Sequence, residues 1–196
     1  MNTKYIELYL NESKEILEKL DVFNIEKLVL ALKNLREQSG RLFVLGLGGN
    51  ASNASHAVND FRKLCEIESY SATDNVSELT ARINDDGWEN CLKNWLRISK
   101  LNEKDAILIL SVGGGSEDKN ISVNLVKAIE YAKENKSKVF GIVGRDGGYT
   151  KENANITVVI PPLVPERVTP HTEGFQALVL HAIVSHPLLQ IIRTKW

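Results

Sequence analysis

From residue 41 onward, short apolar segments alternate with longer amphipathic ones, and this alternation is the feature that most constrains the fold. Amphipathic stretches separate several of the apolar segments, notably residues 86–99 and 118–135. Because parallel strands need long crossover connections, the pattern predicts an α/β fold with a doubly wound parallel sheet of about five strands flanked by helices. The expected strands are residues 41–49, 67–73, 104–115, 138–148 and 155–162.

The two ends of the chain carry helical patterns. Residues 3–38 place apolar side chains at helical spacing, with an interruption near Val22 to Asn24, so we expect two helices there. Residues 172–196 predict a long helix that bends or ends near Pro187, since proline lacks the backbone donor that a helix needs. We expect one domain over 1–196, with residues 1–38 as a helical extension and 41–196 as the α/β core.

The composition excludes several classes of function. Hydrophobic residues make up 43% of the 196 residues and the net charge is −1, so nothing favours nucleic acid or an anionic membrane surface as a partner. No apolar run is long enough to cross a bilayer, and the amphipathic start is unlike a secretion signal. We therefore expect a cytoplasmic protein in which Cys65 and Cys91 are reduced packing residues.

Two of the expected strands end in glycine-rich loops, GLGGN at residues 46–50 and SVGGGS at residues 111–116. Glycines at a strand-to-helix turn let the backbone approach a ligand, and the free N–H groups at a helix start favour an anion such as phosphate. Neither loop has the spacing of a P-loop or of the dinucleotide-binding motif. They are either tight turns without a ligand or the two sides of a crevice at the carboxyl ends of the strands.

Histidines and carboxylates recur at helical spacing in two segments. His56 and Asp60 are four residues apart on a helix expected to begin near Ala51, so they share a face. Glu173 and His181 are eight residues apart, about two turns, on the last helix. Such a set could bind Zn²⁺ or form a general acid–base pair, whereas a single histidine of this kind is more often structural.

Several motifs together resemble those of the phosphoheptose isomerases, which are sugar isomerase (SIS) domain enzymes. GLGGNASNASHAVNDF resembles their GNGGSAADAQHxAxE motif, and ILSVGGGSEDKNI resembles their STSGxS phosphate loop. The stretch VSELTARINDDGWENCL resembles their Asn-Asp-x-Gly-aromatic segment, GRDGG resembles a G-K-x-G-G turn, and the last helix resembles a Gln-x7-His pattern. The motifs follow the family's order and extend over most of the chain after residue 41.

The resemblance implies an SIS fold and an aldose–ketose isomerase, with sedoheptulose 7-phosphate as substrate and a role in heptose synthesis for lipopolysaccharide or capsule. It also implies a homotetramer and a zinc cofactor. Asp60 and His181 match the family's catalytic residues, and the zinc ligands would be His56, Asp60, Glu173 and His181. The implied substrate-binding residues are Gly48, Gly49, Asn50, Asn84, Asp85, Ser111, Gly113, Ser116 and Glu173.

This chain departs from the family pattern at its two loops. Leu47 and Asn50 replace an asparagine and a serine, and Val112 and Gly113 replace the threonine and serine of STS. Asp60 is one methylene shorter than the family's glutamate. The loss of hydroxyls favours a phosphosugar-binding regulator or a protein associated with a replication initiator, whereas the retained ionisable groups favour an enzyme. We expect the enzyme.

His171 is a further candidate, because it lies two residues before the Gln position of the family pattern, where an arginine is more common. It is either a substitute substrate contact or a surface residue at the start of a helix. His186, next to Pro187, is expected to be structural.

Overall fold

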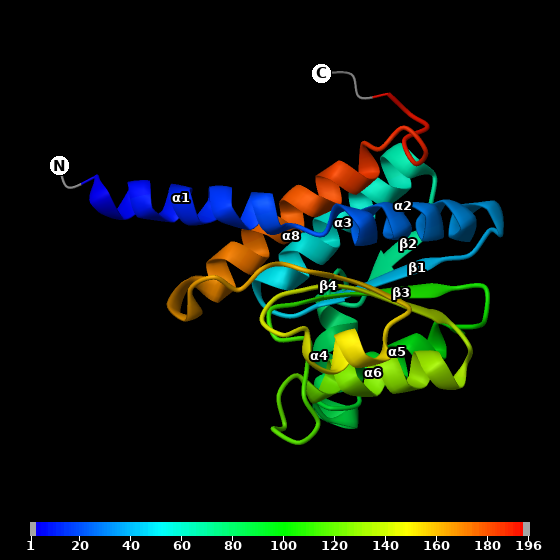
Figure 1. The fold of residues 1–196 in the computed structure, drawn as a ribbon. Helices are drawn as coiled ribbons and strands as arrows, with labels where there is room; N and C mark the ends of the chain where they lie inside the picture. Colours follow the sequence, from blue (N-terminus) through cyan, green and yellow to red (C-terminus); the bar gives the residue numbers. More distant parts are fainter. Residues whose placement is uncertain (1–2, 194–196) are drawn as a thin grey trace.

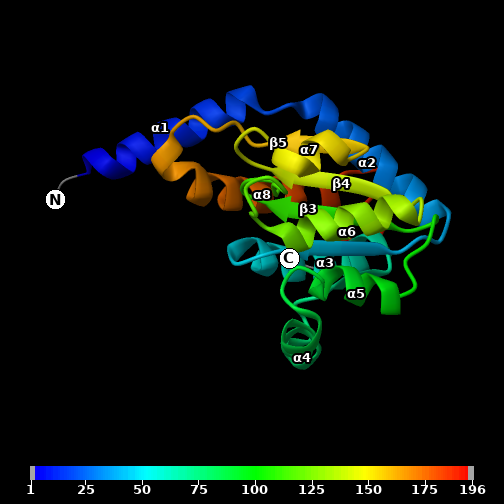
Figure 2. The same ribbon diagram turned by 90° about the horizontal axis from the view of Figure 1, so that it is seen from below.

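The computed structural model describes residues 3–193, and within that range it contains one five-stranded parallel sheet with helices on both faces (Figure 1, Figure 2). The strands lie in the order β2-β1-β3-β4-β5. This confirms the predicted doubly wound α/β fold and the helices ahead of it. The strands are β1 (Leu42–Gly46), β2 (Ser69–Ser71), β3 (Ala106–Ser111), β4 (Lys138–Val143) and β5 (Ile156–Val159).

The helices precede and connect the strands. α1 (Lys4–Lys19) and α2 (Val22–Glu37) form the N-terminal extension, and α8 (Val168–Val184) closes the fold. A 3₁₀ turn, η1 (Pro165–Arg167), leads into α8. The connecting helices are α3 (Gly49–Cys65), α4 (Val76–Asp86), α5 (Cys91–Ile98), α6 (Val123–Glu134) and α7 (Gly148–Asn153).

Side chains of the central strands alternate between two separate cores. In β1, Leu42 and Val44 pack with α2, α3 and α8, whereas Phe43 and Leu45 pack with α5 and α6 on the opposite face. β3 alternates in the same way. Every residue of β1 and β3 is buried, which explains why these strands are continuous apolar runs in the sequence. The two cores fix which helix lies on which face.

The strand order places a topological switch between β1 and β3. From β1 the chain first adds β2 on one side and later adds β3 on the other, so the loops after β1 and β3 diverge to opposite faces of the sheet. A crevice forms at the carboxyl ends of strands at such a point. The two glycine-rich loops follow these two strands, as the sequence predicted.

Several predicted helix boundaries were wrong, each for a local reason. The N-terminal break falls at Leu20 and Asp21, because the Asp21 carboxylate accepts a hydrogen bond from the N–H of Asn24 and so caps α2. The stretch 86–99 is the end of α4 and all of α5, separated by Gly87, whose φ of +79° no helix allows. α6 begins at Val123 rather than 118, after a bridge between Ser116 and Ile121.

α3 and α8 begin earlier than expected. α3 starts at Gly49, two residues before Ala51, and α8 starts at Val168, so α8 has about one additional turn before residue 172. α8 ends at Val184, close to the predicted stop at Pro187. Residues 1, 2 and 194–196 of the predicted domain lie outside the described residues. Among the described helices, none has the length and apolar character needed to cross a membrane.

Candidate active site

The loop after β1 brings the start of α3 close to α8. Gly48 precedes the helix with a φ of +60°, a conformation that suits glycine, and Gly49 is the first helical residue. A methyl group at Gly49 would lie 2.5 Å from the Glu173 carboxylate, so the bare backbone is what lets α8 approach. Asn50 is buried, and its Oδ1 has no hydrogen-bond partner within residues 3–193.

The loop after β3 packs directly on the GRDGG turn after β4. The N–H of Thr150 and its hydroxyl both donate to the carbonyl of Gly114, at 3.0 and 2.7 Å. A methyl group on Gly114 would lie 1.9 Å from the carbonyl oxygen of Gly147. The N–H of Gly114 also donates to the hydroxyl oxygen of Ser111, which ends β3. Glycine is therefore required for these two turns to touch.

A cavity of about 940 Å³ opens between the two loops. Four of the predicted substrate-binding residues line it: Asn50, Ser111, Gly113 and Ser116. Tyr149 also lines the cavity, and burial raises the pKa of its phenol, so it stays protonated and can donate a hydrogen bond. The cavity has the size of a site for a small metabolite.

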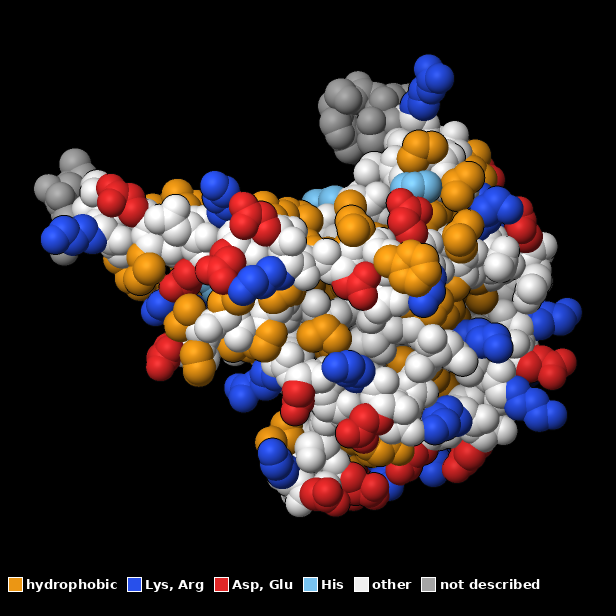
Figure 3. All heavy atoms as spheres, in the orientation of Figure 1, with side chains coloured by type: hydrophobic (Ala, Val, Ile, Leu, Met, Phe, Trp, Pro, Cys, Tyr) orange, Lys and Arg blue, Asp and Glu red, His pale blue; other side chains and the backbone are white. Residues whose placement is uncertain are grey.

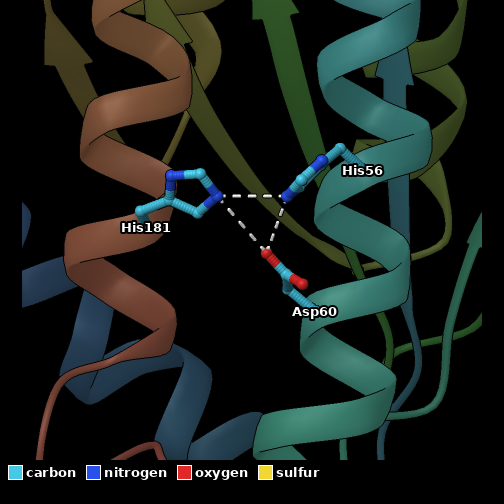
Figure 4. A group of neighbouring side chains, drawn as sticks. All are labelled: His56, Asp60 and His181. Carbon is cyan, nitrogen blue, oxygen red and sulfur yellow. Dashed lines mark hydrogen bonds and ion pairs between the residues drawn. The ribbon is translucent and has the colours of Figure 1, made fainter. Parts of the chain in front are cut away.

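His56, Asp60 and His181 lie together between α3 and α8 (Figure 4). The Nε2 atoms of the two histidines are 3.0 Å apart, and Asp60 Oδ2 lies 3.1 Å from His56 Nε2 and 3.7 Å from His181 Nε2. Both histidine side chains are 59% exposed, while that of Asp60 is 14% exposed. The cluster thus offers two accessible imidazoles over a partly sheltered carboxylate.

Asn53 and Gln176 hold α3 and α8 in the register that creates this cluster. The Asn53 amide donates to the carbonyl of Glu173 at 2.9 Å and to Gln176 Oε1 at 3.2 Å. The Gln176 amide in turn donates to the carbonyl of Ile142 in β4. Sequence reasoning missed both residues, although Asn53 lies three residues before His56 and Gln176 lies on the last helix between Glu173 and His181.

The cluster fits a metal ion of the zinc type. Tetrahedral zinc holds ligand atoms at about 2.0–2.2 Å, which puts the ligands about 3.3 to 3.6 Å from one another. The three separations of 3.0, 3.1 and 3.7 Å bracket that value. Two imidazoles and one carboxylate are a donor set that zinc accepts, and three protein ligands leave a fourth position open.

Glu173, the predicted fourth ligand, lies apart from this group. Its carboxylate contacts Gly49, and its Oε1 lies 3.5 Å from the amide of Asn50 at the start of α3. Asn50 lies six residues before His56, about 9 Å along the helix at 1.5 Å per residue. In the described chain, Glu173 is therefore placed beside the glycine loop and not among the histidines.

Asn84 and Asp85 lie near the end of α4 and are exposed. The Asn84 amide donates to Asp85 Oδ1 at 2.7 Å, and neither residue lines the cavity. α4 has no buried residue and stands away from the sheet (Figure 2). Within one chain these two predicted substrate-binding residues are not brought to the others.

His171 belongs to a second carboxylate–histidine cluster on α8, which is buried. Its Nε2 lies 2.9 Å from Glu12 Oε2, its ring stacks on Tyr9 at 4.2 Å, and it is 3% exposed. Arg167 donates to both carboxylate oxygens of Glu12, at 2.9 and 2.6 Å. Hydrogen bonds from Arg167 and then His171 lower the pKa of Glu12 to about 2. His171 is thus not a surface residue, and it ties α1 to α8.

Comparison with known proteins places the chain in a family. No family model matches it. A phosphoheptose isomerase of Helicobacter pylori strain ATCC 700392 / 26695 is 30% identical over 183 residues, covering 87% of each chain. The chain belongs to the phosphoheptose isomerase family. A phosphoheptose isomerase of Syntrophotalea carbinolica is 27% identical over 189 residues, covering 92% of this chain and 91% of the relative.

Solved structures with the same fold include family members. The phosphoheptose isomerase of Neisseria gonorrhoeae superposes with a TM-score of 0.80 at 22% identity, covering 94% of this chain and 98% of that chain. The enzyme of Francisella tularensis gives a TM-score of 0.80 at 21% identity, with coverages of 94% and 96%. At these identities the structures establish the SIS fold.

Arg145 is a further cavity residue that sequence reasoning missed. It belongs to the GRDGG turn, which in the sequence reads only as a turn that resembles a motif of the phosphoheptose isomerase family. The structure places this turn against the loop after β3, so its side chains reach the same cavity. The positive charge of Arg145 next to the glycines of this turn was the feature of the sequence that could have identified it as a binding residue.

Proposed function

We propose that this member of the phosphoheptose isomerase family converts sedoheptulose 7-phosphate to a heptose 7-phosphate, an aldose–ketose exchange that supplies heptose for surface polysaccharide. The observation that carries the proposal is the cluster of His56, Asp60 and His181 on two helices that begin beside the cavity. Acid–base groups and an anion-binding cavity are the two parts that such a reaction needs.

The reaction moves a proton between C1 and C2 through an enediol. Asp60 would remove the proton from carbon, since its carboxylate is positioned by two imidazoles, and His181 would donate a proton to the carbonyl oxygen. C2 and the phosphate-bearing C7 are separated by five carbon–carbon bonds. A cavity near Asn50 and an acid–base cluster about 9 Å further along α3 suit a substrate of this length.

Zinc is part of the proposal. His56, Asp60 and His181 would hold it, and when bound it would polarise the carbonyl and enediolate oxygens of the sugar. Asp60 cannot be both a tight ligand and a free base, so zinc and a base role for Asp60 compete. Glu173 lies two turns before His181 on α8, beside the glycine loop, and is proposed as a substrate contact at that end of the site.

A homotetramer is also proposed. α1 projects beyond the body of the molecule and carries hydrophobic side chains on its surface (Figure 1, Figure 3). Those more than 45% exposed include Tyr5, Ile6, Leu8, Leu10 and Leu17. Packing between subunits would cover this surface. It would also allow the exposed Asn84 and Asp85 of one subunit to approach the site of another.

The remaining parts of the proposal concern the domain and its location. We propose that the chain forms a single SIS domain that acts in the cytoplasm. The two cysteines are buried free thiols, and burial raises the pKa of Cys65 to about 11, so it stays protonated. The presence of free thiols agrees with a reducing compartment.

The first test combines metal analysis with proton exchange. We expect the purified, untagged protein to contain about one zinc per chain and to exchange the C1 proton of sedoheptulose 7-phosphate with deuterated water. Chelation, Asp60→Asn and His181→Ala should each abolish the exchange. Binding of the phosphosugar without any exchange would contradict the proposal and would favour a phosphosugar-binding regulator on the same fold.

A further inference from the structure

The loop after β3 has fewer side-chain hydroxyls than the STSGxS phosphate loop that it resembles. Val112 and Gly113 lie at its centre and have none, which leaves Ser111 and Ser116 at its ends. Both serine oxygens already accept hydrogen bonds from the loop backbone, from Gly114 and Lys119 respectively. Each serine keeps its own O–H as a donor, so the loop offers a phosphate only two hydroxyl donors and further hydrogen bonds must come from another source.

Backbone groups supply only part of that need. The N–H groups of Gly113 and Gly115 have no hydrogen-bond partner within residues 3–193, and both residues line the cavity. Free backbone N–H groups that point into such a turn can bind an anion. They carry partial charges only, whereas a sugar phosphate carries close to two full negative charges at neutral pH.

Arg145 is in position to supply the missing charge. It lines the cavity, is exposed, and has no hydrogen-bond or ion-pair partner among the described residues. A Cβ built on Gly113 would lie 3.7 Å from the Cδ of Arg145 and 4.0 Å from its Nε. The guanidinium stem thus lies over the loop residue that lacks a side chain.

The backbone of Arg145 is held in place by the packing of the two turns. Tyr149 and Thr150 donate their N–H groups to the carbonyls of Gly115 and Gly114, at 2.9 and 3.0 Å. A methyl group on Gly148 would lie 2.2 Å from the carbonyl of Gly113. Arg145 itself has a φ of +49°, which is unusual for a residue with a side chain. The packed turns therefore fix where its side chain starts.

The other charged residues that line the cavity are less suited to bind a phosphate at this loop. Glu117 lies 3.6 Å from Lys127, and the Asp146 carboxylate accepts a hydrogen bond from the N–H of Gly148. Lys119 lines the cavity from the turn before α6 and has no contact with Gly113 in the structure. The acidic residues that line the cavity are Glu117, Asp118, Asp146 and Glu152, so an unpaired cation at the loop itself matters more for holding an anion.

We propose that Arg145 binds the phosphate of the substrate, in place of the hydroxyls that Val112 and Gly113 lack. Its planar guanidinium can donate two parallel hydrogen bonds to one phosphate, while the N–H groups of Gly113 and Gly115 bind from the loop side. Arg145 then determines the preference for phosphorylated over neutral sugars. This inference rests on the proposed function for the identity of the sugar, but not for the binding of phosphate.

The test compares Arg145→Met with Arg145→Lys and with the control Lys119→Met. Methionine keeps the unbranched stem, so the backbone strain at φ +49° is unchanged. Calorimetric titration with sedoheptulose 7-phosphate and with inorganic phosphate should show Kd about ten- to hundredfold higher in Arg145→Met. Arg145→Lys should fall between, and Lys119→Met should stay within about threefold of wild type.

Gly113→Ser provides a rescue. Gly113 does not have a positive φ and a Cβ there makes only ordinary contacts, so a serine fits. Added to Arg145→Met, it should recover at least part of the lost affinity by restoring a hydroxyl. In turnover, Arg145→Met should raise KM with little change in kcat, because the phosphate is held equally in ground and transition states.

These measurements test phosphate binding by Arg145 separately from isomerase activity. Equal phosphate affinity in Arg145→Met and Lys119→Met would overturn the role of Arg145, even if proton exchange occurs. Loss of phosphate binding in Arg145→Met with no proton exchange in wild type would support Arg145 and contradict the isomerase. Wild-type protein that binds neither ligand at millimolar concentration would overturn both.

Discussion

Two carboxylate–histidine clusters lie ten residues apart on α8, and they have opposite properties. His181 meets Asp60 and His56 of α3 at a surface where both imidazoles are 59% exposed. His171 meets Glu12 of α1 in the interior, where both side chains are less than a tenth exposed. The same residue types thus form an accessible group at one end of the helix and a sealed one at the other.

The difference lies in how many fixed partners each carboxylate has. Glu12 accepts two hydrogen bonds from Arg167 and contacts His171, so its charge is fully neutralised inside the protein. Among residues 3–193, Asp60 Oδ2 faces two mostly exposed imidazoles, and its other oxygen accepts a hydrogen bond from Asn59. A carboxylate with permanent partners is a structural tie, whereas one with exchangeable partners can hold a metal or a proton.

The largest expected effect is on catalysis at the exposed cluster. His181→Ala should lower the rate of proton exchange at least about 100-fold, because it removes the proposed acid. The free energy of unfolding should change by less than about 0.5 kcal/mol, since the side chain is mostly exposed. His186→Ala is the matched control and should leave the exchange rate unchanged. A large loss of stability in His181→Ala would mean that the two clusters do not differ as described.

The next effect is on stability at the buried cluster. Glu12→Ala leaves Arg167 and His171 without their carboxylate, so it should lower the melting temperature more than His181→Ala, His56→Ala or Glu15→Ala. Glu15→Ala, in the exposed pair with Lys19 on the same helix, should cost about 0.5 kcal/mol or less. Calorimetry on the two variants measures the contrast, and similar losses in both would show that the buried cluster does not anchor α1.

Zinc should stabilise the folded protein by binding at the exposed cluster of His56, Asp60 and His181. At a free zinc concentration 100 times the Kd, the wild type should gain about 2.7 kcal/mol of stability. His56→Ala should lose most of this gain, whereas His186→Ala should keep it. Thermal unfolding at several zinc concentrations gives the values. A gain that persists in His56→Ala would place the metal elsewhere.

The smallest effect is the pH dependence of the buried cluster. The pKa of Glu12 is about 2 in the folded protein and about 4.5 as its ordinary value, so the unfolded chain binds its proton first as the pH falls. The stabilisation from ionised Glu12 is therefore complete above about pH 4.5 and is lost progressively toward pH 2. It is smaller than the effect of Glu12→Ala because the side chain remains.

Chemical denaturation of wild type and Glu12→Gln between pH 5 and 2 separates the contribution of ionised Glu12 to the free energy of unfolding from the contributions of the other carboxylates. The difference in stability between the two proteins should shrink as the pH falls. A constant difference over this range would show that the ionised form of Glu12 contributes no stability in the folded state.

Much of the fold was predictable because its signals are local. The apolar runs of β1 and β3 and the glycines that end them follow from burial and from backbone sterics, which act over a few residues. The same holds for His56 and Asp60, since helical spacing alone puts them on one face. Boundaries such as the cap at Asp21 and the break at Gly87 were missed because several residues could have served.

The alternation of strands and helices can be read from the amino-acid sequence, and so can the placement of two glycine-rich loops at the switch between β1 and β3. The packing of α8 against α3 and α1 is what brings His181 but not Glu173 to Asp60, and what buries His171. Likewise, only the packing of two turns brings Arg145 to the cavity. These contacts join residues 36 to 159 positions apart, and local propensities carry no information about which of them form.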